Sequence, residues 1–137
     1  MPIIKQFDTT MHLLQKVLDL REKNQEIIGS NIANAETPGY SSQSFSFEQQ
    51  LQGALTGNSL RPVVTQPNHI PLSPSDLDQV AGTVTSTKDR TGLGDENTVS
   101  VDQEMGKLSQ NEIMYEAAIT MLNKKLSMVK YTINGGA

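Results

Sequence analysis

The stretch Val101–Ile133, VDQEMGKLSQNEIMYEAAITMLNKKLSMVKYTI, carries the clearest structural pattern in the chain. Its apolar positions step by four and three residues from end to end, with one polar exception at Glu112. This spacing places the side chains on one face of a helix, so we predict a helix over residues 100–133 that buries this face as a seam. The predicted seam residues are Val101, Met105, Leu108, Tyr115, Ile119, Leu122, Leu126, Val129 and Ile133.

Both ends of this stretch carry helix signals. Ser100 followed by Gln103 fits a capping box, in which each side chain bonds a backbone N–H of the first turn. Asp102 lies in the first turn and Lys130 near the end, a charge order that suits the helix dipole. Gly135 and the glycine after it are expected to stop the helix.

A second helix is predicted over residues 9–35, with Asp8 or Thr9 as its cap. It has the same alternation of three and four residues, but its centre is polar and therefore weaker as a seam. Pro38 disfavours helical geometry at the residue before it, which predicts the end of the helix. The interface residues predicted here are Met11, Leu14, Leu18 and Ile28.

Residues 41–97 have a different composition, rich in proline, serine and glycine and poor in apolar residues. This composition predicts an irregular segment. We expect that it can form a short helix with Phe47, Leu51 and Leu55 on one side, and short strands at Val63–Thr65 and Gly82–Thr87.

These elements predict an all-α fold in which two long terminal helices pack as an antiparallel coiled coil. Residues 1–40 and 98–137 would together form the helical core, with 41–97 as an intervening segment. The helices could pair within one chain or with neighbouring subunits, and both can hold in a polymer. Apolar residues are only 36% of the chain and aromatic residues 4%, which favours burial against other chains.

The composition also excludes several classes of function. The net charge is −4 and no basic patch exists, which argues against nucleic-acid binding. The chain has no cysteine, so it forms no disulfide. Its first residues, MPIIKQFDTTMHLL, have neither a long uncharged apolar run nor a small-residue cleavage site. We therefore expect no cleaved signal peptide and no transmembrane segment.

No group of residues predicts catalysis. His12 and His69 have no acidic cluster at metal-ligand spacing, and Gly92-Leu93-Gly94 is too short for a phosphate loop. We expect no enzyme activity, no cofactor and no metal.

The segment SNIANAETPGY, Ser30–Tyr40, ends the first predicted helix. Asparagine side chains can bond backbone groups near a helix end, and Thr37-Pro38-Gly39 forces a defined exit. On these grounds alone, an ordinary helix end is as good an interpretation as an assembly motif. The candidate motif residues are Ser30, Asn31, Ile32, Ala33, Asn34, Thr37, Pro38, Gly39 and Tyr40.

This segment resembles the signature of the axial rod and hook proteins of the bacterial flagellum, which reads Asn-Ile-Ala-Asn followed by Thr-Pro-Gly-Tyr. A second stretch, Asp95–Gly136, is similar to the C-terminal region of FlgB-type rod proteins, where Asp-Gly-Asn-Thr-Val leads into a helix. Glu96 stands here in place of the usual glycine. If that glycine has a positive φ, Glu96 must either be strained or change the local turn.

The resemblance implies a structural subunit of the proximal rod of the flagellar basal body, which polymerises through its terminal helices. It implies export by the flagellar type III apparatus without a cleaved signal, and assembly in the periplasm. The implied partners are other rod proteins (FlgC-like), a FliE-like adaptor, the export gate and ring, and further copies of the chain. The alternative is a generic coiled-coil adaptor or a needle-like component of another type III secretion system.

Overall fold

The computed structural model describes the backbone of residues 2–56 and 75–135, and the side chains of residues 9–56 and 77–135. The chain is mostly helical, with a long helix at each end and a small two-stranded sheet in its middle. In chain order the elements are α1 (Pro2–Ala33), β1 (Ser42–Ser46), α2 (Glu48–Thr56), α3 (Ser75–Asp78), β2 (Thr83–Thr87) and α4 (Val101–Ile133).

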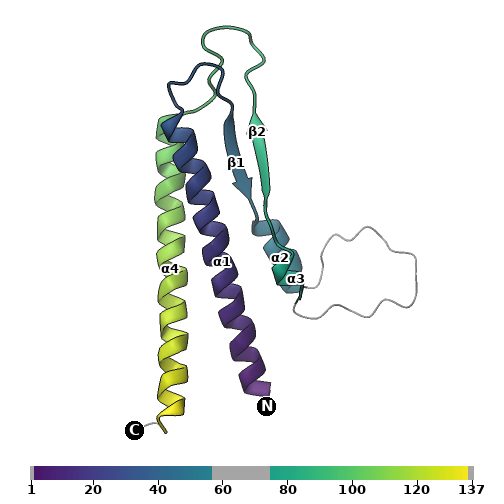
Figure 1. Cartoon of the computed structure of the whole chain (residues 1–137), viewed down its shortest axis with the longest axis vertical. Helices are drawn as coiled ribbons and strands as arrows, with labels where there is room; N and C mark the ends of the chain where they lie inside the picture. The colour runs from purple at the N-terminus through teal and green to yellow at the C-terminus, as the bar shows by residue number, and fades with distance from the viewer. Residues whose placement is uncertain (1, 57–74, 136–137) are drawn as a thin grey trace, which may run out of the picture.

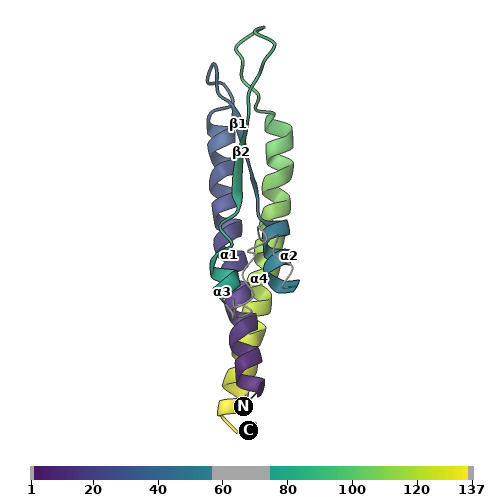
Figure 2. The same cartoon turned by 90° about the vertical axis from the view of Figure 1, so that its right-hand side faces the viewer.

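The two long helices lie side by side and run in opposite directions, so both chain ends lie at the same end of the molecule (Figure 1). Their side-chain contacts follow this order, because Arg21 meets Asn111 and Asn31 meets Glu104. We call the opposite end, where α1 ends and α4 begins, the junction. The loops there extend beyond both helices (Figure 2).

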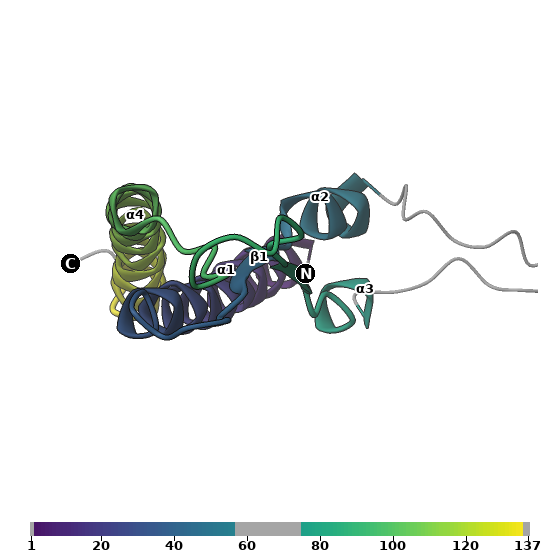
Figure 3. The same ribbon diagram turned by 90° about the horizontal axis from the view of Figure 1, so that it is seen from above.

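The sheet lies along α1 on the side away from α4 (Figure 3). Strands β1 and β2 are antiparallel, with Ser42 opposite Thr87 and Ser46 opposite Thr83. Both strands are short and carry many Ser and Thr residues. The helix α1 is therefore the central element, with α4 on one side and the sheet on the other.

A small apolar core lies between α1 and the end of the sheet nearest α2. Leu20, Phe47 and Val80 are buried together. Half-buried Phe45 packs against them, with its ring centroid 5.5 Å from that of Phe47. The guanidinium of Arg21 lies 4.8 Å from the Phe47 ring centroid, close enough for a cation–π contact.

The helix α1 starts earlier than predicted. It begins at Pro2, so the predicted start at residue 9 with a cap at Asp8 or Thr9 is wrong. Proline suits the first helical position because its fixed φ is already helical and its missing N–H has no partner there. The helix ends at Ala33, where the side chain of Asn34 donates to the carbonyl of Ser30 at 2.8 Å.

The bounds of α4 agree with the predicted helix, but its cap does not. Ser100 is the N-cap and makes no side-chain capping bond, so the predicted capping box is wrong. Its backbone carbonyl accepts from Glu104 N at 2.9 Å, so the first helical hydrogen bond forms without help from the Ser100 side chain. At the other end, Gly135 has φ +74°, as expected of a glycine that stops a helix.

The middle segment holds more regular structure than an all-α fold allows. The predicted short helix is confirmed as α2, although Phe47 lies just before its first residue, and the strand candidate Gly82–Thr87 is confirmed as β2, which begins at Thr83. The strand β1 was not predicted, because its sequence SQSFS is mostly polar. The strand candidate Val63–Thr65 lies outside the described residues.

Candidate assembly site

Asn31 is fully buried at the junction and has a partner for each of its polar atoms. Its Nδ2 donates to the carbonyl of Gln43 at 2.7 Å and to Glu104 Oε2 at 2.9 Å. Its Oδ1 accepts from Gln43 N at 2.9 Å and from the Tyr40 hydroxyl at 3.3 Å. One side chain thus pairs with β1 as a neighbouring strand would, and also ties α1 to α4.

The partner of Asn31 on α4 is a buried carboxylate. Glu104 is 3% exposed, and its second oxygen lies 2.6 Å from Lys107 Nζ. Burial of a carboxylate is costly unless its oxygens are paired, and here each oxygen has a donor. The Asn31–Glu104 contact therefore sets how α4 lies along α1 at the junction.

The exit from α1 is built from asparagine side chains and a left-handed glycine. Thr37 Oγ1 donates to Asn34 Oδ1 at 3.2 Å, while Gly39 has φ +73° and donates its N–H to the carbonyl of Asp95 at 2.6 Å. Asn97 Nδ2 donates to the carbonyls of Asn34 and Thr37, at 2.9 and 2.7 Å. The segment that follows α1 is therefore hydrogen-bonded to the segment that precedes α4.

Two further residues extend this fastening to the sheet. The hydroxyl of Tyr40 lies 3.3 Å from Ser30 Oγ, and its carbonyl accepts from Thr98 N at 3.2 Å. Thr98 Oγ1 accepts from Ser42 N at 2.8 Å and donates to the carbonyl of Thr87 at 2.7 Å. Thr98 therefore links β1 and β2 by hydrogen bonds at the strand ends nearest the junction.

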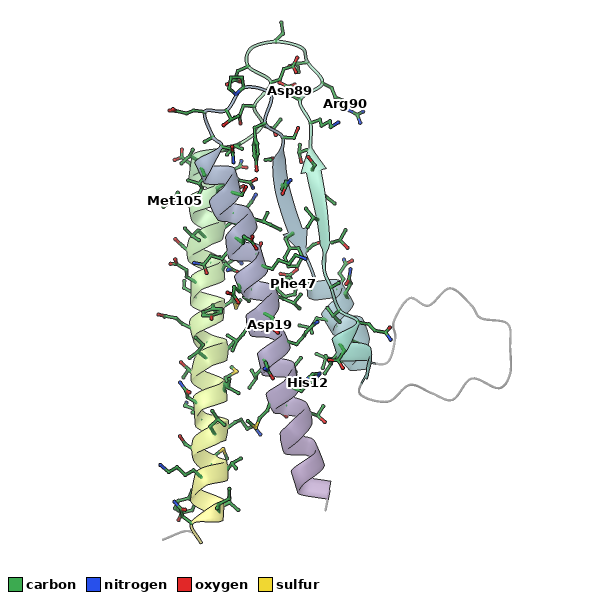
Figure 4. All side chains as sticks on the ribbon, viewed as in Figure 1. His12, Asp19, Phe47, Asp89, Arg90 and Met105 are labelled. Atoms are coloured by element: carbon green, nitrogen blue, oxygen red, sulfur yellow. The ribbon has the colours of Figure 1, made fainter. Side chains whose placement is uncertain are left out.

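The loop beyond the sheet has its own local hydrogen bonds. Thr91 donates to Asp89 Oδ1 through its side chain at 2.7 Å and through its N–H at 2.8 Å. These bonds lower the pKa of the Asp89 carboxyl, which lies at the tip of the molecule (Figure 4).

Glu96 adopts a left-handed backbone conformation, with φ +57°. Glu96 carries a Cβ atom, so it bears the steric strain of this conformation. A left-handed conformation costs a residue with a Cβ atom about 1–2 kcal/mol, whereas glycine loses only about 0.5–1 kcal/mol more chain entropy.

We therefore expect Glu96→Gly to raise the free energy of unfolding by about 0.5–1 kcal/mol, measured by urea denaturation. The matched control is Glu116→Gly within α4, where φ is helical and the same change should lower stability by about 1 kcal/mol. Destabilisation by both changes would contradict strain at Glu96.

The contact between α1 and α4 is polar at its centre as well as at the junction. Asn111 is 1% exposed and accepts from Asn24 Nδ2 at 3.0 Å and from Arg21 Nη1 at 3.5 Å. Its own Nδ2 donates to the carbonyl of Arg21 at 2.9 Å. Paired polar groups of this kind specify register more than they add stability.

A groove of about 310 Å³ runs between α1, β1 and α4. Arg21, Asn111, Glu104 and Lys107 line it together with Phe45. The buried Nε of Arg21 has no hydrogen-bond partner among the described residues. Polar and apolar groups both line the groove, and its charged residues are paired, Lys107 with Glu104 and Arg21 with Glu48.

The predicted seam of α4 divides into two rows. Leu108, Tyr115, Leu122 and Val129 are half-buried. The remaining predicted residues are exposed, with exposed fractions from 36% at Ile119 to 77% at Ile133. The fully buried residues of α4 are instead Glu104, Asn111 and Ala118, which lie on the other flank of the half-buried row.

We call the exposed row the outer stripe of α4. It consists of Met105, Glu112, Ile119, Leu126 and Ile133, which recur every seven residues. Met105 points away from the sheet (Figure 4). Within the described part of the chain, α1 is the element that packs on α4, and it leaves this stripe uncovered. On α1, Met11, Leu14 and Leu18 are half-buried and Ile28 is buried.

Comparison with known proteins identifies the family. The family model described as "Flagella basal body rod protein" matches residues 18–40, from the middle of α1 through the exit motif. A FlgB flagellar basal body rod protein of Proteus mirabilis (strain HI4320) is 30% identical over 98% of this chain and 100% of its own length. The chain belongs to the FlgB family of flagellar basal body rod proteins.

The FlgB relatives span distant bacteria. The protein of Yersinia enterocolitica is 31% identical over 98% of this chain and 100% of its own length. That of Bacillus subtilis (strain 168) is 30% identical over 95% of this chain and 97% of its own length. As a FlgB-family member, the chain is a structural subunit of the flagellar basal body rod. The generic coiled-coil adaptor and the needle-like component are not favoured.

Three polar residues, two at the junction and one at the centre of the α1–α4 contact, were not predicted as site residues from the sequence. Glu104, Asn97 and Asn111 are polar, and a search for apolar periodicity passes over them. Their spacing was a usable signal. Glu104, Asn111 and Ala118 recur every seven residues, and each lies four residues before a half-buried residue of α4. The predicted interface residues themselves stay a prediction for contacts between subunits.

No metal or membrane site was found within the described residues. They contain no cluster of three His, Asp or Glu side chains that could hold a metal ion. His12 lies 2.8 Å from Asp78, a contact between α1 and α3 on the exposed surface (Figure 4). None of the described helices is long and apolar enough to span a bilayer.

Proposed function

We propose that this FlgB-family chain builds the proximal part of the rod by polymerising through its terminal helices, and that it works without catalysis. The observation that supports this proposal most directly is the outer stripe of α4. Leu126 and Met105 are about half exposed in the free chain, at 46% and 49%. A heptad row of apolar side chains on a helix that packs on only one side favours a further helical partner.

Residues 1–40 and 98–137 would act in this polymer as one helical unit, with 41–97 as an appendage that packs on α1. We infer that α1 and α4 pack as an antiparallel coiled coil within the unit. The seven-residue spacing of Glu104, Asn111 and Ala118 beside Leu108 and Tyr115 supports this packing.

The Ser30–Tyr40 motif would hold this unit in shape during assembly. Asn31 sets the register of the helices, while Asn34 and Gly39 fasten the exit of α1 to the loop that enters α4. A neighbouring subunit would then meet a surface of fixed shape, which lowers the entropy cost of association.

The partners and the location follow the family resemblance. The proposed partners are other rod proteins (FlgC-like), a FliE-like adaptor, and the export gate and ring. The proposed location is the periplasm, which the chain would reach by export without a cleaved signal. Membership of the rod family supports assembly of this chain with other components of the flagellum.

The experiment is complementation of a strain that lacks its own copy of this rod gene. Wild type should restore swimming, whereas Leu126→Glu should reduce the swimming radius to that of the empty vector. A carboxylate in an apolar contact between helices is costly to bury, yet at this exposed position the free chain should fold normally by circular dichroism.

The matched control is Ile113→Glu, because Ile113 is 67% exposed on α4 but lies off the outer stripe. We expect this variant to swim. Normal swimming by Leu126→Glu would contradict assembly through the outer stripe, and failure of wild type to restore swimming would contradict the rod function.

A further inference from the structure

Asn134 and Gly135 follow the last residue of α4 and form the single Asn-Gly pair in the sequence. Both residues are exposed. Asn134 is the C-cap of α4, with φ −78° and ψ 10°, and Gly135 has the left-handed φ of +74°. A Cβ atom placed on Gly135 would meet nothing within 4 Å apart from its chain neighbours, so the space around this peptide bond is open.

The side chain of Asn134 is a carboxamide that makes no hydrogen bond within the described part of the chain. Asn31 and Asn111 differ from it, because both are buried and both use their side-chain oxygen and nitrogen in hydrogen bonds. The carboxamide of Asn134 is therefore free to turn its Cγ atom toward the backbone nitrogen of Gly135.

The backbone nitrogen of Gly135 is well placed to attack this carbon. Glycine has no Cβ atom, so it does not obstruct the approach and it tolerates the backbone rotation that ring closure requires. Asn134 lies outside α4, and rotation about its ψ breaks only the long hydrogen bond from Gly135 N to the Thr132 carbonyl, at 3.3 Å. Asn123 lies inside α4, where helical hydrogen bonds on both sides fix its ψ.

We propose that Asn134 deamidates spontaneously, with the Gly135 nitrogen as the attacking atom. That nitrogen gives its proton to solvent and bonds to Asn134 Cγ, the Cγ–Nδ2 bond breaks, and ammonia leaves with a proton from water. The product is a five-membered cyclic imide. Water then opens the ring, at the side-chain carbonyl to give aspartate or at the backbone carbonyl to give isoaspartate. In net terms, one carboxamide and one water become one carboxylate and one ammonium ion.

The reaction places a negative charge at the C-terminal end of α4. The helix dipole is already negative there, so a carboxylate is unfavourable, and Lys130 in the last turn offsets only part of this. Isoaspartate also adds a methylene to the main chain, which moves Gly135 N away from the Thr132 carbonyl. The last turn of α4, which carries Ile133 of the outer stripe, should therefore loosen. If the chain assembles through α4, a consequence that rests on the proposed function, aged subunits would differ from fresh ones at this contact.

Mass spectrometry of the ageing chain tests the site. The purified full-length chain is kept in a mildly alkaline buffer, sampled over time and digested, and the peptides are examined for aspartate and isoaspartate. We expect conversion at position 134 in both forms, with the gain of one negative charge, several times faster than at Asn123. Asn123 is the matched control because it is also exposed but lies inside the helix. An unchanged residue 134, or equal conversion at both positions, overturns the inference.

Gly135→Ala tests the attacking nitrogen. The added methyl group has room, but it hinders the approach of the nitrogen to Asn134 Cγ. Deamidation at position 134 should become several times slower, and an unchanged rate overturns the assignment of this nitrogen. Isoaspartate content provides a second measurement, because it forms only through the cyclic imide. Aspartate without isoaspartate in the wild-type chain would indicate direct hydrolysis and overturn the proposed step.

The pair Asn134→Asp and Asn134→Gln tests the consequence for α4. The first variant carries the charge of the product from the start, whereas the second keeps a neutral carboxamide. Backbone amides in the last turn of α4 should exchange with solvent faster in Asn134→Asp than in Asn134→Gln, and equal exchange overturns the loosening of the helix end. All of these measurements use the free chain, so their failure leaves the rod function untouched, and that function is tested separately by swimming.

Discussion

Replacing Asn31 with alanine is expected to lower the free energy of unfolding by about 3 kcal/mol. The substitution removes four hydrogen bonds at a side chain with no solvent access, so water cannot replace them. It leaves the N–H and carbonyl of Gln43 without their partner, and it removes one donor from the buried carboxylate of Glu104. Unpaired buried groups cost about 1–3 kcal/mol each, and partial relaxation reduces their sum. Urea denaturation followed by circular dichroism measures the change.

The control for this prediction is Asn123→Ala, the same chemical change at an exposed position of α4. It should alter stability by less than about 0.5 kcal/mol, because surface substitutions away from special features have small effects. A loss below about 1 kcal/mol for Asn31→Ala would contradict its place at the centre of the junction.

Replacing Phe47 with alanine is expected to have a similar or larger effect, about 3–5 kcal/mol. Phe47 is 2% exposed and is the largest side chain of the small core with Leu20 and Val80. Its loss leaves a cavity between α1 and the sheet, and removes the ring that Arg21 covers. The sheet should loosen first, since few other apolar contacts hold it to α1.

Leu55→Ala provides the comparison for Phe47→Ala, because Leu55 is 52% exposed on α2. It should cost less than about 1 kcal/mol. Hydrogen exchange at β1 distinguishes the two variants further: amides of Ser42–Ser46 should exchange faster only in Phe47→Ala. Equal exchange in both variants would contradict the dependence of the sheet on this core.

The long helices could be predicted from sequence because periodicity is strong in α4 and because a left-handed glycine and a proline mark the ends. The strand β1 could not, since its polar residues Ser42, Gln43 and Ser44 lack the usual strand signal. It forms because Asn31 and Thr98, distant in sequence, supply partners for its backbone. Such pairing depends on the tertiary fold.

Only part of the face of α4 that packs on α1 could be predicted from the sequence, because the buried polar residues on this face depend on partners from α1. The apolar row through Leu108 and Leu122 belongs to two possible seams, and apolar periodicity favours the more hydrophobic one. The helix α1 packs on the other, where Glu104 and Asn111 are buried because α1 offers Asn31, Asn24 and Arg21 as partners. A single helix sequence does not contain the partners that make a buried polar residue favourable.

The pairing of the two chain ends has a consequence for the order of folding. Side-chain bonds between α1 and α4 join residues 73 to 90 positions apart, as in the Asn31–Glu104 and Arg21–Asn111 contacts. Contacts at such separation form late, because the entropy of closing the intervening chain is lost before they are gained. A chain that enters a compartment with its N-terminus first cannot complete the pair until α4 has followed. If this subunit is exported as proposed, delivery of its C-terminal helix would set the time at which it acquires its final shape.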